Sequence, residues 1–266
     1  MPELPEVETI RRQISPAIAG KRIIGAWHTP NRKFVSASDV VGRSVRVVNR
    51  RGKYLVFALD DDRELIVHLG MTGVVRLRSG TSIDPYVRAS WTFDDDTVLE
   101  LRDVRQFGRV AAVAAGDYRL LPTLHALGPD PFDPGLTARE FYRSLRKSSQ
   151  RVKTQLLSQR PIAGVGNIYA DEALWRACVH PGSRRVSQAR AHDLLEALRT
   201  VLAQGIDNGG TTLRDYRSFT GETGSNQHSL DCYGRHGQPC PRCGNSLVRR
   251  VYDGRGTTFC PVCQRV

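Results

Sequence analysis

The first eight residues of the chain, MPELPEVE, combine groups that can do chemistry at a chain terminus. Removal of Met1 leaves Pro2 with a secondary amine. An α-amino group titrates near pH ~8, so part of it is neutral and nucleophilic at neutral pH. Glu3 and Glu6 lie within reach of that amine and can move protons. The combination indicates Schiff-base chemistry on a sugar carbon, although Pro5 and the glutamates also suit the first turn of an ordinary helix.

The C-terminal tail carries four cysteines with the spacing of metal ligands. Cys240 and Cys243 form one Cys-x2-Cys pair, and Cys260 and Cys263 form a second pair after 16 intervening residues. This spacing is typical of a structural zinc site, and four thiolates leave no open position for a catalytic water. Disulfides are the alternative, which a cytoplasmic location disfavours. We expect one structural zinc ion at the base of a hairpin, with Arg255 near the tip.

The charge of the chain favours a polyanionic partner. The formal net charge is +12, and the tail from residue 235 onward holds six arginines and one acid. Nucleic acid is the simplest partner for such a surface. No apolar run approaches the ~20 residues needed to span a bilayer, and acids stand where the apolar core of a signal peptide belongs. We therefore expect a cytoplasmic, monomeric protein that binds nucleic acid and no membrane.

The first half of the chain is predicted to be a helix followed by short strands. Val7, Ile10 and Ile14 recur at helical spacing, which predicts a helix over residues 5–17. Apolar residues then alternate with a period of two. Such closely spaced strands indicate a β-sandwich or barrel. The expected strands are residues 22–27, 45–50, 53–59, 64–69, 73–78, 87–93, 98–103 and 109–114.

The second half of the chain is predicted to be helical. The Gly/Pro-rich segment 128–135 interrupts regular structure and is interpreted as a domain linker. Thr137 opens a helix with a capping box, residues 152–159 form a second helix, and Ser187 caps a long helix that ends near residue 210. Between them, Asn167 follows a glycine turn and is expected to cap another helix and bind a phosphate. A routine αα-corner is the alternative.

Together these patterns predict an α+β fold with two domains. An N-terminal helix plus β-sandwich is followed by a helix–two-turns–helix bundle with a C-terminal zinc-finger hairpin. The predicted boundaries are 1–130 for the sandwich domain, 131–228 for the helical domain and 229–266 for the four-cysteine zinc finger.

Six motifs, in the same order and over nearly the whole chain, resemble the bacterial formamidopyrimidine-DNA glycosylases. The resemblance implies a bifunctional repair enzyme that removes oxidised purines, such as 8-oxoguanine and formamidopyrimidines, from double-stranded DNA. It also implies strand nicking by β,δ-elimination. The motifs are PELPEVE at residues 2–8, RGKYL at 51–55, HLGMTG at 68–73, DVRQFG at 103–108, GVGNIYA at 164–170 and the zinc tail.

The resemblance also implies a role for each matched residue of the reaction. Pro2 matches the nucleophile that attacks the sugar C1′, and Glu3 matches the proton donor. Glu6 matches a second carboxylate that positions the ring or a water. Lys53 matches a lysine that contacts phosphate and assists elimination, although a solvated hairpin lysine is the alternative.

Further matched residues are expected to contact DNA. Asn167 and Arg255 match a phosphate clamp. Met71, Arg105 and Phe107 match residues that enter the duplex when the damaged nucleotide is everted. Flipping a base costs a few kcal/mol, and a side chain in the gap recovers part of it. Without the resemblance, Met71 and Phe107 read as core residues beside glycine turns. We also expect DNA contacts from His68, Lys153 and Tyr169.

Two departures from the family pattern bear on specificity. Ser225 and Asn226 stand where the base-closing loop is expected to carry bulky side chains, which puts the preferred lesion in question. Gln106 stands where many relatives carry a second arginine, which puts the preferred opposite base in question. Three alternatives remain open: an endonuclease VIII-like enzyme for oxidised pyrimidines, a non-catalytic zinc protein that binds damaged DNA, and a basic RNA-binding protein.

Overall fold

The structure, a computed structural model, describes residues 2–80 and 84–265, and the chain divides into two compact units. The first unit comprises Met1–His125 and Asn208–Ser225, and the second comprises Ala126–Asp207 and Asn226–Val266. Segment 208–225 therefore belongs with the sandwich, whereas we had expected it in the helical domain. Hydrogen bonds to α1 hold it there, for example from Phe219 N to Gln13 Oε1 at 3.0 Å.

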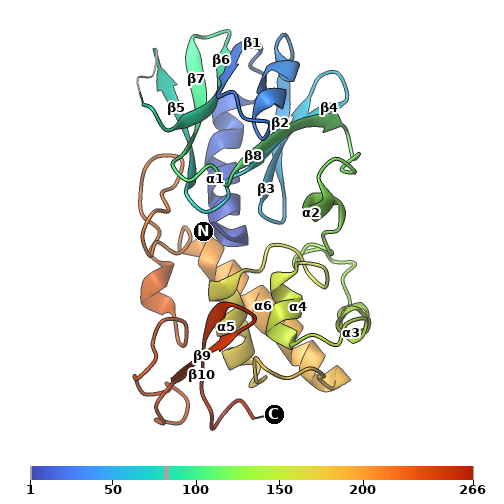
Figure 1. Ribbon diagram of the computed structural model, residues 1–266, viewed down its shortest axis with the longest axis vertical. Helices are drawn as coiled ribbons and strands as arrows, with labels where there is room; N and C mark the ends of the chain where they lie inside the picture. Colours follow the sequence, from blue (N-terminus) through green and yellow to red (C-terminus); the bar gives the residue numbers. More distant parts are fainter. Residues whose placement is uncertain (1, 81–83, 266) are drawn as a thin grey trace. The chain divides into compact units, whose positions relative to one another are not determined.

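Helix α1 (Leu4–Ile18) and two antiparallel four-stranded sheets form the first unit (Figure 1). One sheet has the order β1-β6-β7-β5 and the other has the order β2-β3-β4-β8. Every strand lies within a residue or so of its predicted range, which confirms the predicted sandwich. The strands are β1 (Ile23–His28), β2 (Val45–Arg51), β3 (Tyr54–Leu59), β4 (Arg63–His68), β5 (Gly73–Ser79), β6 (Val87–Phe93), β7 (Thr97–Asp103) and β8 (Arg109–Ala114).

The core of the first unit lies between the two sheets. Trp91 and Phe93 of one sheet and Phe57 of the other belong to a single buried cluster, which Ile10 and Ile14 of α1 complete. The alternation of apolar and polar residues along each strand predicts this arrangement, because successive side chains point to opposite faces of a sheet. Packing around this core fixes the ends of the strands, and therefore the positions at which the connecting loops begin and end.

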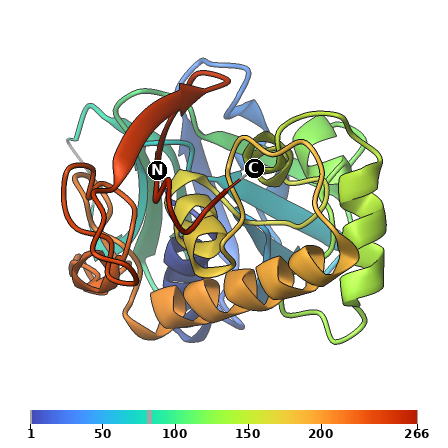
Figure 2. The ribbon, with the colours of Figure 1, turned by 90° about the horizontal axis from the view of Figure 1, so that it is seen from below.

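The second unit is a helical bundle with a metal-binding tail. Its helices are α3 (Ala138–Arg146), α4 (Val152–Leu157), α5 (Asn167–Arg176) and α6 (Gln188–Asp207), and α6 packs against α3 and α5 (Figure 2). The predicted caps are present. Thr137 Oγ1 accepts from Glu140 N at 3.2 Å, and Ser187 Oγ accepts from Arg190 N at 3.2 Å.

Several details differ from the sequence expectations. Gly166 is the N-cap of α5 and Asn167 is the first helical residue, so Asn167 does not cap the helix. Short elements of four to six residues were not predicted, because they are too brief to show a helical period. They are η1 (Val35–Val40), α2 (Pro122–His125) and η2 (Asn226–Ser229). Among the described residues, none of the helices has the length and apolarity to cross a membrane.

The tail forms the predicted hairpin, β9 (Val248–Tyr252) and β10 (Arg255–Phe259). Asp253 and Gly254 make its turn, with φ of 48° and 77°. Positive φ at both central residues is the signature of a type I′ turn, which suits the twist of a two-residue hairpin. Arg151 Nη1 lies 2.6 Å from Asp253 Oδ1. The turn is thus fixed to α4, and Arg255 is the first residue after it.

Candidate functional site

A buried carboxylate organises the N-terminal turn. Glu6 Oε2 accepts from the backbone N–H of Glu3 at 2.7 Å, and Glu6 Oε1 accepts from Thr211 N at 2.7 Å. Glu3 and Glu6 are 2% and 1% exposed, and Pro2 is also buried. Charge-assisted hydrogen bonds of this kind are strong, especially away from water. Glu6 therefore fixes the residue next to Pro2 and joins it to segment 208–225.

The segment that meets Glu6 has room for no side chain at Gly210. Its φ is +89°, and an added Cβ would lie 2.9 Å from Tyr216 Cε1 and 3.0 Å from Glu6 Cγ. The Tyr216 hydroxyl donates to Gly209 O at 3.1 Å. Burial and the nearby Glu6 carboxylate raise the pKa of Tyr216, so its phenol is neutral at physiological pH. Glu6 is thus closely packed, and its carboxylate lies near the neutral phenol of Tyr216.

Lys53 lies in the two-residue turn between β2 and β3, and α1 braces that turn. Arg50 Nε donates to Glu8 Oε2 at 3.0 Å, and Arg50 Nη1 donates to Gly52 O at 3.2 Å. Burial raises the pKa of Glu8, but Arg11 and Arg50 outweigh it and hold the pKa below its usual value. Lys53 itself is 5% exposed, which excludes a solvated hairpin lysine.

His68 lies opposite Tyr54 on adjacent strands, with ring centroids 4.6 Å apart. Its Nδ1 accepts from Gly70 N at 3.3 Å. Burial, followed by the charges of Lys53 and Arg109, lowers the pKa of His68 to about 4. The imidazole is therefore neutral at physiological pH, and a hydrogen bond from a backbone N–H is what a neutral Nδ1 can accept.

The residues expected to enter the duplex lie on two loops of the first unit. Met71 is 36% exposed and Phe107 is 47% exposed, so neither is a core residue. The Arg105 guanidinium carbon lies 4.6 Å from the centroid of the Phe107 ring. Gln106, with a φ of 54°, accepts from Asn31 Nδ2 at 3.1 Å through its side-chain oxygen. Gln106 thus has its side chain hydrogen-bonded within its own unit.

In the second unit, Asn167 and Arg255 come together. Asn167 Nδ2 donates to Gly256 O at 3.1 Å, and Gly256 follows Arg255 directly. Arg255 is exposed. Asn167 Oδ1 is buried and accepts no hydrogen bond within the described residues. The start of α5 therefore contacts the tip of the zinc hairpin, and a phosphate clamp formed by Asn167 and Arg255 stays a prediction.

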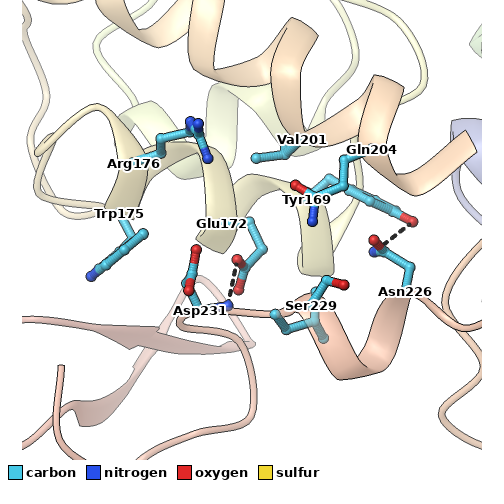
Figure 3. Close-up of a pocket in the computed structure, with 10 residues that line it drawn as sticks. Tyr169, Glu172, Trp175, Arg176, Val201, Gln204, Asn226, Ser229 and Asp231 are labelled. Atoms are coloured by element: carbon cyan, nitrogen blue, oxygen red, sulfur yellow. Dashed lines mark hydrogen bonds between the residues drawn. The ribbon is translucent and has the colours of Figure 1, made fainter. Parts of the chain in front are cut away.

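Lys153 and Tyr169, both expected to contact DNA, are buried in the second unit. Lys153 is 1% exposed, and its Nζ lies 2.6 Å from Asp171 Oδ1 and 2.8 Å from Thr257 Oγ1. Tyr169 is fully buried, and its hydroxyl accepts from Asn226 Nδ2 at 3.4 Å (Figure 3). Both side chains are committed to partners inside the unit. Their contact with DNA stays a prediction.

Glu172 is a structural residue that sequence reasoning missed. Its carboxylate accepts from three successive backbone N–H groups, those of Asp231, Cys232 and Tyr233, at 2.9, 2.9 and 2.6 Å. Figure 3 shows the bond from Asp231. The cavity beside it measures about 10 Å³, which is room for about one water and none for a base. The sequence did contain a signal of a structural role, since Asp171 and Glu172 are adjacent acids in a helix of mostly apolar residues.

The four tail cysteines converge as a metal site. Their sulfurs all lie within 4.8 Å of one another, and none of the six cysteines is in a disulfide. Zn–S bonds of about 2.3 Å in a tetrahedron place sulfurs about 3.8 Å apart, so the set fits one structural zinc ion. Trp175 Nε1 donates to Cys240 Sγ at 3.3 Å. The end of α5 is thus joined to the metal ligands.

The comparisons with known proteins agree over the whole chain. Family models match the formamidopyrimidine-DNA glycosylase N-terminal domain at residues 1–110 and its H2TH domain at residues 127–217. A third model, a zinc finger found in FPG and IleRS, matches residues 237–266. The formamidopyrimidine-DNA glycosylase of Deinococcus radiodurans is 46% identical over 99% of this chain and 97% of its own length.

Solved structures give the same result. The MutM (FPG) protein from Thermus thermophilus superposes with a TM-score of 0.92 at 44% identity, over 99% of this chain and 98% of the other. The Lactococcus lactis Fpg in complex with abasic-site DNA superposes with a TM-score of 0.89 at 36% identity, over 99% and 100%. The chain therefore belongs to the formamidopyrimidine-DNA glycosylase family.

Proposed function

We propose that this chain is a base-excision repair enzyme, a bifunctional DNA glycosylase and AP lyase. Its substrate is double-stranded DNA that contains an oxidised purine, 8-oxoguanine or a formamidopyrimidine. The observation that supports it best is the N-terminal turn, where Glu6 holds Glu3 beside Pro2 in a chain that the family matches from end to end. We further propose that the enzyme acts as a monomer on the nucleoid in the bacterial cytoplasm.

The reaction begins at Pro2 once Met1 has been removed. The secondary amine attacks C1′, the N-glycosidic bond breaks, and its electron pair leaves with the base, which takes up a proton. Glu3 donates a proton to O4′, and the sugar ring opens at that atom. The amine loses its proton, so the product is an iminium ion between Pro2 and C1′. Glu6 positions this turn through its two backbone hydrogen bonds.

The lyase steps follow from the iminium ion. Its positive charge acidifies the C2′ proton, and loss of that proton breaks the C3′–O bond and releases the 3′ phosphate. A second elimination releases the 5′ phosphate, and water then hydrolyses the imine and restores Pro2. The positive charge of Lys53 stabilises the leaving phosphate. The braced β2–β3 turn holds this side chain in place before the reaction.

Binding and eversion use the partly buried Asn167 and four exposed side chains. Asn167 and Arg255 bind a backbone phosphate, which contributes affinity without reading sequence. Met71, Arg105 and Phe107 enter the duplex at the gap left by the flipped nucleotide. The loop that ends at Ser225 and the hydrogen-bonded Gln106 set the preferred lesion and opposite base. Ser225 N and Oγ both donate to Asn208 O, which fixes the end of that loop.

Borohydride trapping tests this proposal, because borohydride reduces an imine to a stable bond. The enzyme is incubated with an 8-oxoguanine duplex and with an abasic duplex, and the covalent product is measured. The proposal predicts trapping on both. A chain with an N-terminal extension, which converts the Pro2 amine to an amide, should bind both duplexes and trap neither. Trapping on the abasic duplex alone would assign a different lesion. Binding without trapping on either duplex would support the non-catalytic alternative.

A further inference from the structure

We propose that Asp103 is a positioning residue that holds the two duplex-entering loops together as one unit. The first insertion loop is residues 69–72, which carries Met71. The second insertion loop is residues 104–108, which carries Arg105 and Phe107. This inference rests on the proposed function and names the residue that makes lesion eversion efficient.

The carboxylate of Asp103 bonds to both loops at once. Thr72 Oγ1 donates to Asp103 Oδ1 at 2.6 Å, and Gly108 N donates to Asp103 Oδ2 at 2.7 Å. The Thr72 hydroxyl also accepts from Arg105 N at 3.2 Å. One oxygen thus serves the first insertion loop and the other serves the second. The bridge passes from Asp103 through Thr72 to the backbone of Arg105, one of the residues expected to enter the duplex.

Asp103 is itself immobilised. It ends β7, where it pairs with Gly73 of β5, and it is 0% exposed. Its N–H donates to Tyr86 O at 2.9 Å, and its carbonyl accepts from Arg88 Nε at 2.8 Å. With the backbone fixed on both sides, the short side chain has little freedom. Asp103 is therefore a rigid anchor on the sheet and not a part of either insertion loop.

Close packing joins the loops near the anchor. Gly70 has a φ of +65°, and an added Cβ would lie 2.5 Å from Phe107 C and 2.6 Å from Gly108 N. An added Cβ on Gly108 would lie 3.0 Å from Asp103 Oδ2. The backbones of the two loops touch, so a shift of one moves the other. Met71 and Phe107 consequently keep a fixed relative position.

A fixed relative position matters because the gap in the duplex is filled by both loops together. Eversion costs unstacking and unpairing, and side chains already in place recover part of that cost without first being ordered. Loss of the Asp103 bridge leaves the chemistry at Pro2 intact and makes insertion less favourable. The effect should therefore depend on how firmly the target nucleotide is stacked and paired.

Two nearly isosteric variants test the bridge. Asp103→Asn replaces one acceptor with a donor that faces Thr72 or Gly108, and Thr72→Val removes the hydroxyl. We expect excision of 8-oxoguanine from a fully paired duplex to fall by about 10- to 100-fold, the scale of a misplacement of about 1 Å. Trapping on an abasic duplex should change by less than about 3-fold, because an abasic nucleotide is cheaper to evert. Thr72→Ser, which keeps the hydroxyl, should excise 8-oxoguanine at close to the wild-type rate.

Two further measurements separate positioning from stability. Thermal unfolding must match that of Asp62→Asn, an exposed aspartate of the same unit. A fluorescent base opposite the lesion reports insertion directly, even if the enzyme proves to have no glycosylase activity. Unchanged fluorescence and excision in Asp103→Asn would overturn the inference, and so would an equal loss on paired and abasic duplexes. Failure of the wild-type enzyme to trap either duplex would instead remove the proposed function.

Discussion

The two units hold their loops by related but unequal means. In the first unit, the buried carboxylates of Glu6 and Asp103 accept backbone N–H groups from loops. In the second unit, Asp171 and Glu172 do the same for the tail, and four thiolates hold the tail as well. The first unit therefore depends on individual hydrogen bonds, and the second unit has a metal centre in addition.

Within the second unit, the two buried carboxylates differ in how their charge is stabilised. Burying a carboxylate is costly unless it is paired or hydrogen-bonded. Asp171 has the ammonium of Lys153 at 2.6 Å, whereas Glu172 has three backbone N–H donors. Removing one partner of a buried ion pair lowers the stability of the fold strongly, because the other charge stays buried alone. A carboxylate that accepts from backbone N–H groups keeps these donors when nearby side chains change.

Removal of zinc should unfold the tail and spare the first unit. Zinc binding contributes roughly 10–16 kcal/mol in zinc-finger peptides, far more than any single hydrogen bond. We expect Cys240→Ser or a strong chelator to abolish tight DNA binding, while amide signals of the sandwich persist in NMR spectra. Cys178→Ser, outside the metal site, should retain one zinc ion per chain. Loss of the sandwich signals along with the metal would break the comparison.

Replacement of Lys153 should be the most damaging single change among the buried carboxylate contacts. Lys153→Met leaves Asp171 buried without its cation and should cost about 3–5 kcal/mol in the free energy of unfolding of the second unit. The double variant Lys153→Met/Asp171→Asn should recover most of that loss. Urea unfolding of the three proteins gives the result. Equal stabilities for the single and double variants would contradict a charge pair.

The first unit should lose stability in acid through His68. Its pKa is about 4 in the folded protein and ~6.5 in an unfolded chain. Between these values the unfolded chain binds more protons, so this stability is fully present above pH ~6.5 and is lost as pH falls toward 4. The loss is at most about 3 kcal/mol. The difference in stability between wild type and His68→Asn, measured by urea unfolding from pH 7.5 to pH 4, should shrink accordingly.

The smallest effect should come from a helix cap outside both sets of loops. Thr137 caps α3 through a bond to Glu140 N on an exposed surface. Thr137→Ala should cost about 1 kcal/mol in unfolding of the second unit and leave DNA binding unchanged. Thr137→Ser is the matched control and should behave as wild type. A change in DNA affinity in Thr137→Ala would show that remote stability, and not local positioning, controls binding.

The sequence predicted what local patterns encode. Alternation along the chain located all eight strands of the sandwich, and cysteine spacing located the metal ligands. Thr137 and Ser187 marked helix starts because capping uses residues three apart. These features depend on neighbours within a few residues, which a sequence displays directly.

Contacts between distant segments escaped prediction. Glu6 and Thr211 are 205 residues apart, so no spacing rule reveals that Thr211 meets the N-terminal turn. The return of segment 208–225 to the first unit was missed for the same reason. Lys153 was expected to contact DNA, and only the fold reveals that it is buried with Asp171 beside it. Family resemblance predicts the reactive residues, whereas the structure shows the long-range contacts that surround them.

The most direct test of the account is to identify the residue that carries the trapped sugar. The borohydride-reduced complex with an abasic duplex is digested with nuclease and protease, and the modified peptide is sequenced by mass spectrometry. The account predicts a single adduct on the nitrogen of Pro2, in a chain without Met1. An adduct on Lys53 or another lysine, with Pro2 unmodified, would contradict the central claim that the N-terminal turn is the reactive site.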